Sequence, residues 1–274
     1  MISIKRFFIT VFSVWLVVVP IISLIDFIDS QGDVYWFAPL IGPLGILTYF
    51  AFVKWRRPFD SKIASLVITV MVAVCLLITV GQRFFDSEEI LTPIFLALGS
   101  LVGWLLYDRW FVKLPQQSIQ AENPGSWKFE DTEGNSKTLS NLKAPLKVLC
   151  FNMGNSDPYL WAQAEHYYKS KESFESRNAK IVFVSGDRQV DFSSEIGQSI
   201  EFWTDPNLEN SGKLGITQAA ITHSGFLRWQ KKIATPTLII VDQNNDVVFS
   251  KVMKDYRNRP DTDFILRILD ANQR

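Results

Sequence analysis

The stretch "LKVLCFNMGNSDPYL", residues 146–160, joins a compact apolar run to the start of a helix. The apolar run is typical of a buried strand. Asp157 and Pro158 then predict a helix start, because aspartate is a favoured N-cap and proline is favoured at the first helical position. The corner between the two elements therefore lies at the carboxyl end of a strand, where α/β folds usually carry their chemistry.

The sequence around this corner predicts further strands and helices. A hairpin is expected on either side of Glu133-Gly134-Asn135, and a second buried strand in "KIVFVSG" follows a helical stretch at 158–177. Strand, helix and strand at this spacing predict a parallel crossover. Beyond it we expect a short strand "IEFWT", a helix at about 219–231, a hairpin turning at Asn244-Asn245, and a last helix in "DTDFILRILDANQR".

The first part of the chain predicts an all-α membrane domain of about four transmembrane helices. Four apolar segments approach the roughly 20 residues that a spanning helix needs, at 7–24, 35–53, 63–80 and 90–107. The fourth is short and carries Pro93. Basic residues precede the first segment, lie between the second and third, and follow the fourth, so the positive-inside rule predicts that both termini are cytoplasmic. These residues are Lys5, Arg6, Lys54, Arg56, Arg57, Lys62, Arg109 and Lys113.

The expected domain boundaries follow from this pattern. A transmembrane domain is predicted at 1–112, a linker at 113–126 and a second domain at 127–274. The predicted spans carry no ionisable groups away from their ends, so we interpret them as an anchor in the lipid bilayer. The pattern G-x-x-x-G at Gly99 and Gly103 allows close helix approach and predicts helix-mediated self-association.

Composition excludes several classes of function. The 28 basic residues balance 28 acidic ones, so no overall positive field indicates nucleic acid binding. The two cysteines, Cys75 and Cys150, form no C-x-x-C pair. The two histidines, His166 and His223, show no metal-ligand spacing. We therefore expect no metal site and no cofactor.

The order of elements from 127 to 272 resembles the thioredoxin fold, and in detail the redoxin branch of the alkyl hydroperoxide reductase/thiol-specific antioxidant family. "FEDTEGNSKTLSNLKAPLKVLCF" is similar to the segment that opens the domain in that family, and "DYRNRPDTDFILRIL" to the ending of one subgroup. "ATPTLIIVDQNNDVVF" resembles its segment with a cis-proline, which implies a cis peptide bond between Thr235 and Pro236. The resemblance implies a central mixed sheet flanked by helices.

The same resemblance implies a degenerate active site. The subgroup carries Gly-x-x-Cys-Pro-aromatic-Cys after the first core strand, and here Gly154 is followed by Asp157-Pro158-Tyr159-Leu160. Aspartate and leucine thus stand where the two cysteines would be. A helix N-terminus stabilises a carboxylate as it does a thiolate, but a carboxylate forms neither a sulfenic acid nor a mixed disulfide. Asp157 is interpreted chiefly as a helix cap, and alternatively as a ligand-binding carboxylate facing Thr235 and Pro236.

Other candidate residues carry weaker signals. Cys150 lies in mid-strand, where cysteine is usually an inert apolar group, so it is a weak candidate for the nucleophile. His166 and His223 have no catalytic partner that the sequence reveals. Asp242 is explained by a strand end and turn. Arg257 and Arg259 are expected to brace the last helix, with an anion contact as the alternative.

Three functional hypotheses follow. The first is a multi-pass protein of a bacterial inner membrane whose redoxin domain has lost redox activity and binds a peptide or protein partner in the cleft at Asp157, Thr235 and Pro236. The second, implied by the resemblance taken at face value, is a thiol-dependent peroxidase or thiol-disulfide oxidoreductase using Cys150 or a partner's cysteine. The third places the function in the membrane spans, with the redoxin domain regulatory.

Overall fold

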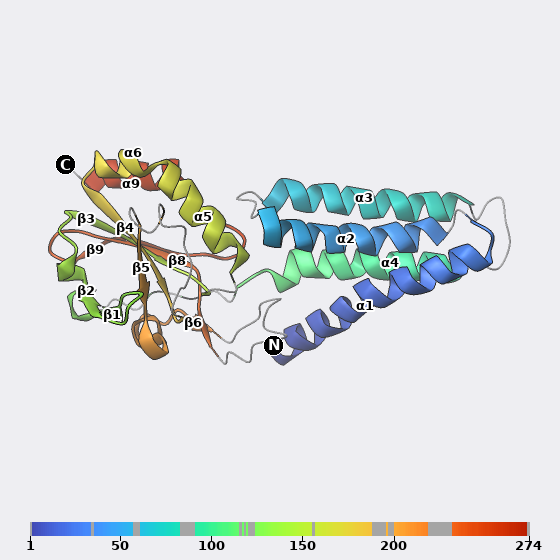
Figure 1. Cartoon of the computed structure of the whole chain (residues 1–274), viewed down its shortest axis with the longest axis horizontal. Coiled ribbons are helices and arrows are strands. Elements are labelled where there is room, and N and C mark those ends of the chain that lie inside the picture. Colours follow the sequence, from blue (N-terminus) through green and yellow to red (C-terminus); the bar gives the residue numbers. More distant parts are fainter. Residues whose placement is uncertain are drawn as a thin grey trace. The chain divides into compact units, whose positions relative to one another are not determined.

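The computed structural model describes residues 2–33, 36–56, 61–82, 91–114, 117, 119, 124–154, 157–187, 196, 200–218 and 232–272. The chain divides into two compact units, Met1–Lys113 and Leu114–Arg274. Figure 1 shows the helices and strands that make up each unit.

The unit Met1–Lys113 is helical. Its helices are α1 (Ile2–Asp29), α2 (Phe37–Arg56), α3 (Ser61–Gln82) and α4 (Leu91–Leu106), and α4 continues as a π-helical turn, η3 (Tyr107–Phe111). The helices pack side by side, α1 on α2 and α4, and α3 on α2 and α4 (Figure 1). Hydrogen bonds join the helices: Trp15 Nε1 donates to Ser100 Oγ at 3.1 Å, and Trp104 Nε1 donates to Thr69 Oγ1 at 2.9 Å.

Gly99 and Gly103 lie at a contact between two helices of this unit. A Cβ atom at Gly99 would collide with the ring of Trp15, and one at Gly103 with the ring of Phe12. Both rings belong to α1, so the small residues let α1 and α4 of the same chain approach closely. The glycine pattern is thereby explained without a second copy, and it no longer supports self-association.

The expectation of four transmembrane helices needs correction. Among the described residues, two helices are long and apolar enough to cross a membrane, Phe7–Asp29 and Leu91–Phe111. The apolar stretches in α2 and α3, Phe37–Ala51 and Ser65–Gly81, are shorter than the roughly 20 residues that span the hydrocarbon core. The fourth predicted segment passes the test because the apolar helix runs on through η3. Length and composition make these two helices candidates for membrane spans and no more.

The unit Leu114–Arg274 is built on a seven-stranded mixed sheet. Its strands are β1 (Lys128–Glu130), β2 (Ser136–Thr138), β3 (Leu146–Phe151), β4 (Ala179–Ser185), β5 (Glu201–Thr204), β8 (Thr237–Val241) and β9 (Val247–Val252), in the order β2-β1-β5-β4-β3-β8-β9. The pairs β3–β4 and β4–β5 are parallel, and the other pairs are antiparallel. A central mixed sheet with flanking helices is the thioredoxin-like arrangement that we expected.

Short elements complete this unit. The helices are α5 (Pro158–Lys169), α6 (Lys171–Glu175), α8 (Glu209–Lys213) and α9 (Thr262–Asn272), with single turns at η4 (Pro124–Ser126), η5 (Leu139–Asn141) and η6 (Pro206–Leu208). A two-stranded sheet pairs β6 (Thr217–Gln218) with β7 (Ile233–Ala234). The sequence predicted neither this sheet nor α8, and the one helix expected at 158–177 is interrupted at Ser170. The helix expected at 219–231 lies outside the described residues.

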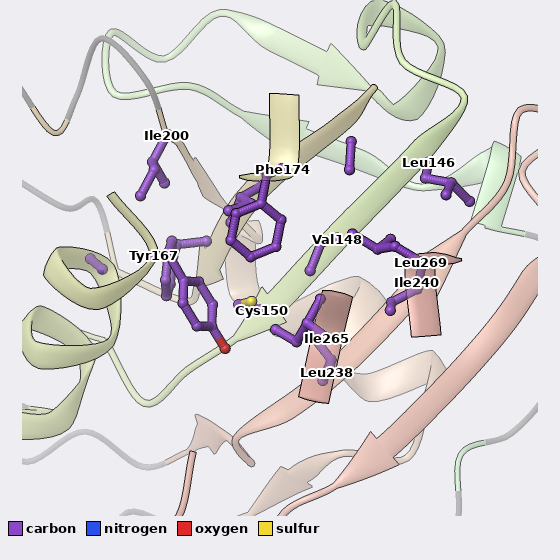
Figure 2. Close-up of a cluster of buried hydrophobic side chains, with 14 of the residues drawn as sticks. Leu146, Val148, Cys150, Tyr167, Phe174, Ile200, Leu238, Ile240, Ile265 and Leu269 are labelled. Carbon is purple, nitrogen blue, oxygen red and sulfur yellow. The ribbon is translucent and has the colours of Figure 1, made fainter. Parts of the chain in front are cut away.

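Two hydrophobic clusters cover the two faces of the sheet. On one face, β3, β4 and β8 pack against α5, α6 and α9, with Cys150, Tyr167 and Ile265 among the buried side chains (Figure 2). On the other face, Leu149, Val182 and Ile239 pack with Trp127 and Trp203. Because successive residues of a strand point to opposite faces, Cys150 and Leu149 belong to different clusters. This packing fixes the carboxyl end of β3, from which the candidate site begins.

Candidate functional site

Asp157 caps helix α5 as the sequence predicted. Its backbone is extended, Pro158 is the first helical residue, and its Oδ1 accepts a hydrogen bond from the Tyr159 backbone N–H at 3.0 Å. Between β3 and this cap, Gly154 has a φ of +87°, and a Cβ there would collide with the Asp187 carboxylate. Glycine tolerates this left-handed conformation, which turns the chain from strand to helix.

The second oxygen of Asp157 is paired with Arg259, which the sequence did not place here. Arg259 Nη2 donates to Asp157 Oδ2 at 2.5 Å, and the side chains of Asp157 and Arg259 are 0% and 3% exposed. Arg259 Nε and Nη1 find no hydrogen-bond acceptor within the described part of the chain. Asp157 is therefore one half of a buried ion pair at the start of α5.

Thr235 and Pro236 lie at the same end of the sheet. Phe151, at the end of β3, is opposite Thr237 on β8, so the two residues before Thr237 lie beside the chain that leaves β3. Both are buried, and no residue of the described chain makes a hydrogen bond to the Thr235 hydroxyl. The expectation of a cis peptide bond is wrong: the bond between Thr235 and Pro236 is trans. The Pro236 carbonyl accepts a hydrogen bond from Met253 N at 2.9 Å.

Tyr159 and Leu160, the remaining candidate positions, are also buried. Tyr159 is 3% exposed and its ring lies edge-on to Tyr256, with 5.9 Å between the centroids. Leu160 belongs to the core cluster beneath α5. Asp157, Tyr159 and Leu160 thus lie at the start of α5, Thr235 and Pro236 lie beside the end of β3, and all five residues are buried.

Cys150 lies in the core and away from solvent. It pairs with Phe183 on β4 and Leu238 on β8, and it is 2% exposed. Apolar side chains surround its sulfur (Figure 2). Burial raises the pKa of the Cys150 thiol far above its usual range, against a smaller opposing effect of the Arg259 charge. Because thiol chemistry requires the thiolate, this setting suppresses reactivity.

We expect Cys150 in a Cys75→Ala background to resist alkylation. In the folded full-length chain in mild detergent, iodoacetamide should label Cys150 on the order of 10⁴-fold more slowly than in the denatured chain, because labelling requires opening of the core. The species that reacts is the opened chain, in which the thiol regains its ordinary pKa of about 8.5. The native and denatured rates should therefore rise together with pH, and their ratio should stay about constant. Comparable native and denatured rates would contradict the burial.

The other candidate residues that the structure describes make contacts typical of structural roles. Asp242 Oδ1 accepts hydrogen bonds from Asn244 N and Asp246 N, as expected of a turn between β8 and β9. His166 lies on α5 with its ring against Tyr167, and His223 lies outside the described residues. Arg257 pairs with Asp255 at 2.9 Å. In the described parts of the chain, no group of three histidine, cysteine, aspartate or glutamate side chains could hold a metal ion.

Comparison with known proteins agrees with the resemblance seen in the sequence. Residues 119–250 match the model of the AhpC/TSA family, which is just under half of the chain. These residues therefore carry an AhpC/TSA redoxin domain. No curated protein sequence matches the chain.

Solved structures of peroxiredoxins align with the same part of the molecule. Peroxidoxin BcpB from Mycobacterium tuberculosis is 16% identical with a TM-score of 0.44, and the alignment covers 57% of this chain and 98% of that one. A mutant of peroxiredoxin 6 from Arenicola marina is 15% identical with a TM-score of 0.47, covering 57% and 73%. AhpC of Mycobacterium bovis is 20% identical with a TM-score of 0.41, covering 59% and 100%. Likenesses of this size carry no argument about function.

Proposed function

We propose that this redoxin domain is a redox-inactive binding module for a protein or peptide, and that the helical unit anchors it in the membrane. The observation that carries the proposal is the buried pair Asp157–Arg259 at the start of α5. A carboxylate there keeps a negative charge at the helix N-terminus and cannot accept electrons from, or donate them to, a disulfide or peroxide. The fold is retained while the reacting atom is absent from this position.

The surroundings of Cys150 argue against the alternative of a thiol-dependent peroxidase. A catalytic thiol should be partly exposed with a lowered pKa, whereas Cys150 is buried and its pKa is raised. Catalysis through Cys150 would require β3 to leave its place inside the sheet, between β4 and β8.

The membrane part of the proposal rests on the apolar surface of the helical unit. Large aliphatic side chains are exposed along α1, α3 and α4, among them Ile28, Leu77 and Phe95. Exposed apolar surface of this extent is suited to lipid. We propose a multi-pass protein of a bacterial inner membrane with both termini in the cytoplasm. Retention of the full chain in membranes after alkaline carbonate washing supports anchoring, and release into the supernatant would count against it.

Partner binding can be tested by affinity capture with the full chain in mild detergent. The wild type is compared with Thr235→Val, which removes a hydroxyl and keeps the branched shape, and with Tyr159→Leu, which removes an aromatic ring. Loss of a specific captured protein in both variants is the expected result. A captured set that is the same in all three proteins would show that binding, if any, takes place elsewhere.

A further inference from the structure

The candidate site is covered by a segment of the same domain. The segment Met253–Asp261, which we call the strap, links β9 to α9. It contacts the site at three points: Met253 N donates to Pro236 O at 2.9 Å, Tyr256 packs on Tyr159 at 5.9 Å, and Arg259 pairs with Asp157 at 2.5 Å. Outside the site, Pro260 O accepts a hydrogen bond from Tyr167 Oη, in the last turn of α5, at 2.7 Å. The strap therefore occupies the position where a partner would have to bind.

The contacts of the strap show which chemistry the first turn of α5 recognises. Asp157 offers a carboxylate oxygen, and Tyr159 offers an aromatic ring. The strap supplies the complementary groups three residues apart, the ring of Tyr256 and the guanidinium of Arg259. The neighbouring arginine is not used in this way, because Arg257 is bound by Asp255 within the strap itself.

The contact between the strap and the site leaves hydrogen-bond donors of Arg259 unsatisfied. Arg259 is almost fully buried, yet two of its three nitrogens, Nε and Nη1, have no acceptor among the described residues. Buried donors without acceptors weaken the closed arrangement, because they lose their bonds to water and gain none in return. An occupant that keeps the pair with Asp157 and also satisfies these donors would compete favourably with the strap.

We propose that the strap is a built-in occupant of the site, and that a partner enters by replacing it with an extended segment of the same chemistry. Such a segment carries an arginine for Asp157 and an aromatic residue, three positions earlier, for Tyr159. This inference rests on the proposed binding function and names the class of partner. Asp157 then acts as the carboxylate that binds the arginine of the partner.

The first experiment uses the wild-type chain in mild detergent and a blocked peptide with the strap sequence of residues 255–261, in which glutamine replaces Arg257 (DYQNRPD) so that trypsin does not cut the peptide itself. The matched control peptide has glutamine in place of the arginine at position 259. Trypsin cuts after Arg257 only when the strap is accessible, and it does not cut the bond between Arg259 and Pro260. Excess strap peptide should accelerate cleavage after Arg257 in the protein, and the control peptide should not. Equal effects of the two peptides would overturn the inference.

The second experiment opens the site by substitution. The double variant Tyr256→Ala/Arg259→Gln keeps Asp157 and Tyr159 but removes both strap groups. The fluorescent strap peptide should bind this variant about tenfold more tightly than it binds the wild type, and about tenfold more tightly than the control peptide does, because the arginine makes a charge-assisted hydrogen bond. Binding that does not depend on the arginine would refute the proposal. Affinity capture that still depends on Thr235 would leave the proposed function standing in that case.

Discussion

Asp157→Ala is expected to destabilise the C-terminal unit by about 3–5 kcal/mol, because it leaves the buried Arg259 without its counter-charge. The same change removes the cap of α5, which alone contributes about 1 kcal/mol. Because one carboxylate makes both interactions, the loss of about 3–5 kcal/mol in stability includes the loss of the cap.

The rate of Cys150 alkylation measures this loss of stability in the C-terminal unit, to which Cys150 belongs. Cys150 becomes accessible only when the core opens, so the opening equilibrium, and with it the labelling rate, should rise by roughly 10²- to 10³·⁶-fold in Asp157→Ala. The measurement is made on the full chain in mild detergent, in a Cys75→Ala background.

Two matched variants separate the ion pair from the cap. Asp157→Asn keeps a good N-cap and nearly the same volume but removes the charge. The double variant Asp157→Leu/Arg259→Met replaces both charges with apolar groups, which often costs little. We expect the double variant to be more stable than Asp157→Ala. A loss of only about 1 kcal/mol in Asp157→Ala would mean that the cap matters and the ion pair does not.

Asp205→Ala is expected to produce the second large effect, about 3 kcal/mol. Asp205 is fully buried, and its carboxylate accepts four hydrogen bonds. They come from the backbone N–H and the side chain of both Asn210 and Ser211. These bonds hold two consecutive residues, Asn207 and Leu208, at positive φ angles of 55° and 56°. Left-handed backbone at a leucine is costly and persists only where its surroundings enforce it.

Hydrogen exchange can locate this effect. In Asp205→Ala, the amides of Asn210 and Ser211 should exchange faster than in the wild type, because their acceptor is gone. Asp205→Asn, which retains one acceptor oxygen, should give an intermediate rate. Unchanged protection of both amides in Asp205→Ala would contradict the assigned role.

Local patterns in the sequence predicted much of the redoxin domain. The run at 146–151 became β3, Asp157-Pro158 began α5, and Asn244-Asn245 turned the last hairpin, with Asn245 at a φ of 64°. Each of these three features depends on residues that are close together in the sequence. Asp157 and Arg259 are 102 positions apart, and no local pattern indicates that they pair. The conformation of Pro236 and the lengths of the apolar helices likewise depended on tertiary context.

The central claim is that the domain has no peroxidase activity of its own. The most direct test measures peroxide consumption by the full chain in mild detergent, with a thiol reductant supplied, for the wild type beside Cys150→Ala. We predict no turnover above the reductant alone in either protein, because Asp157 cannot react and Cys150 is buried. Turnover by the wild type that disappears in Cys150→Ala would contradict the account and identify a one-cysteine peroxidase.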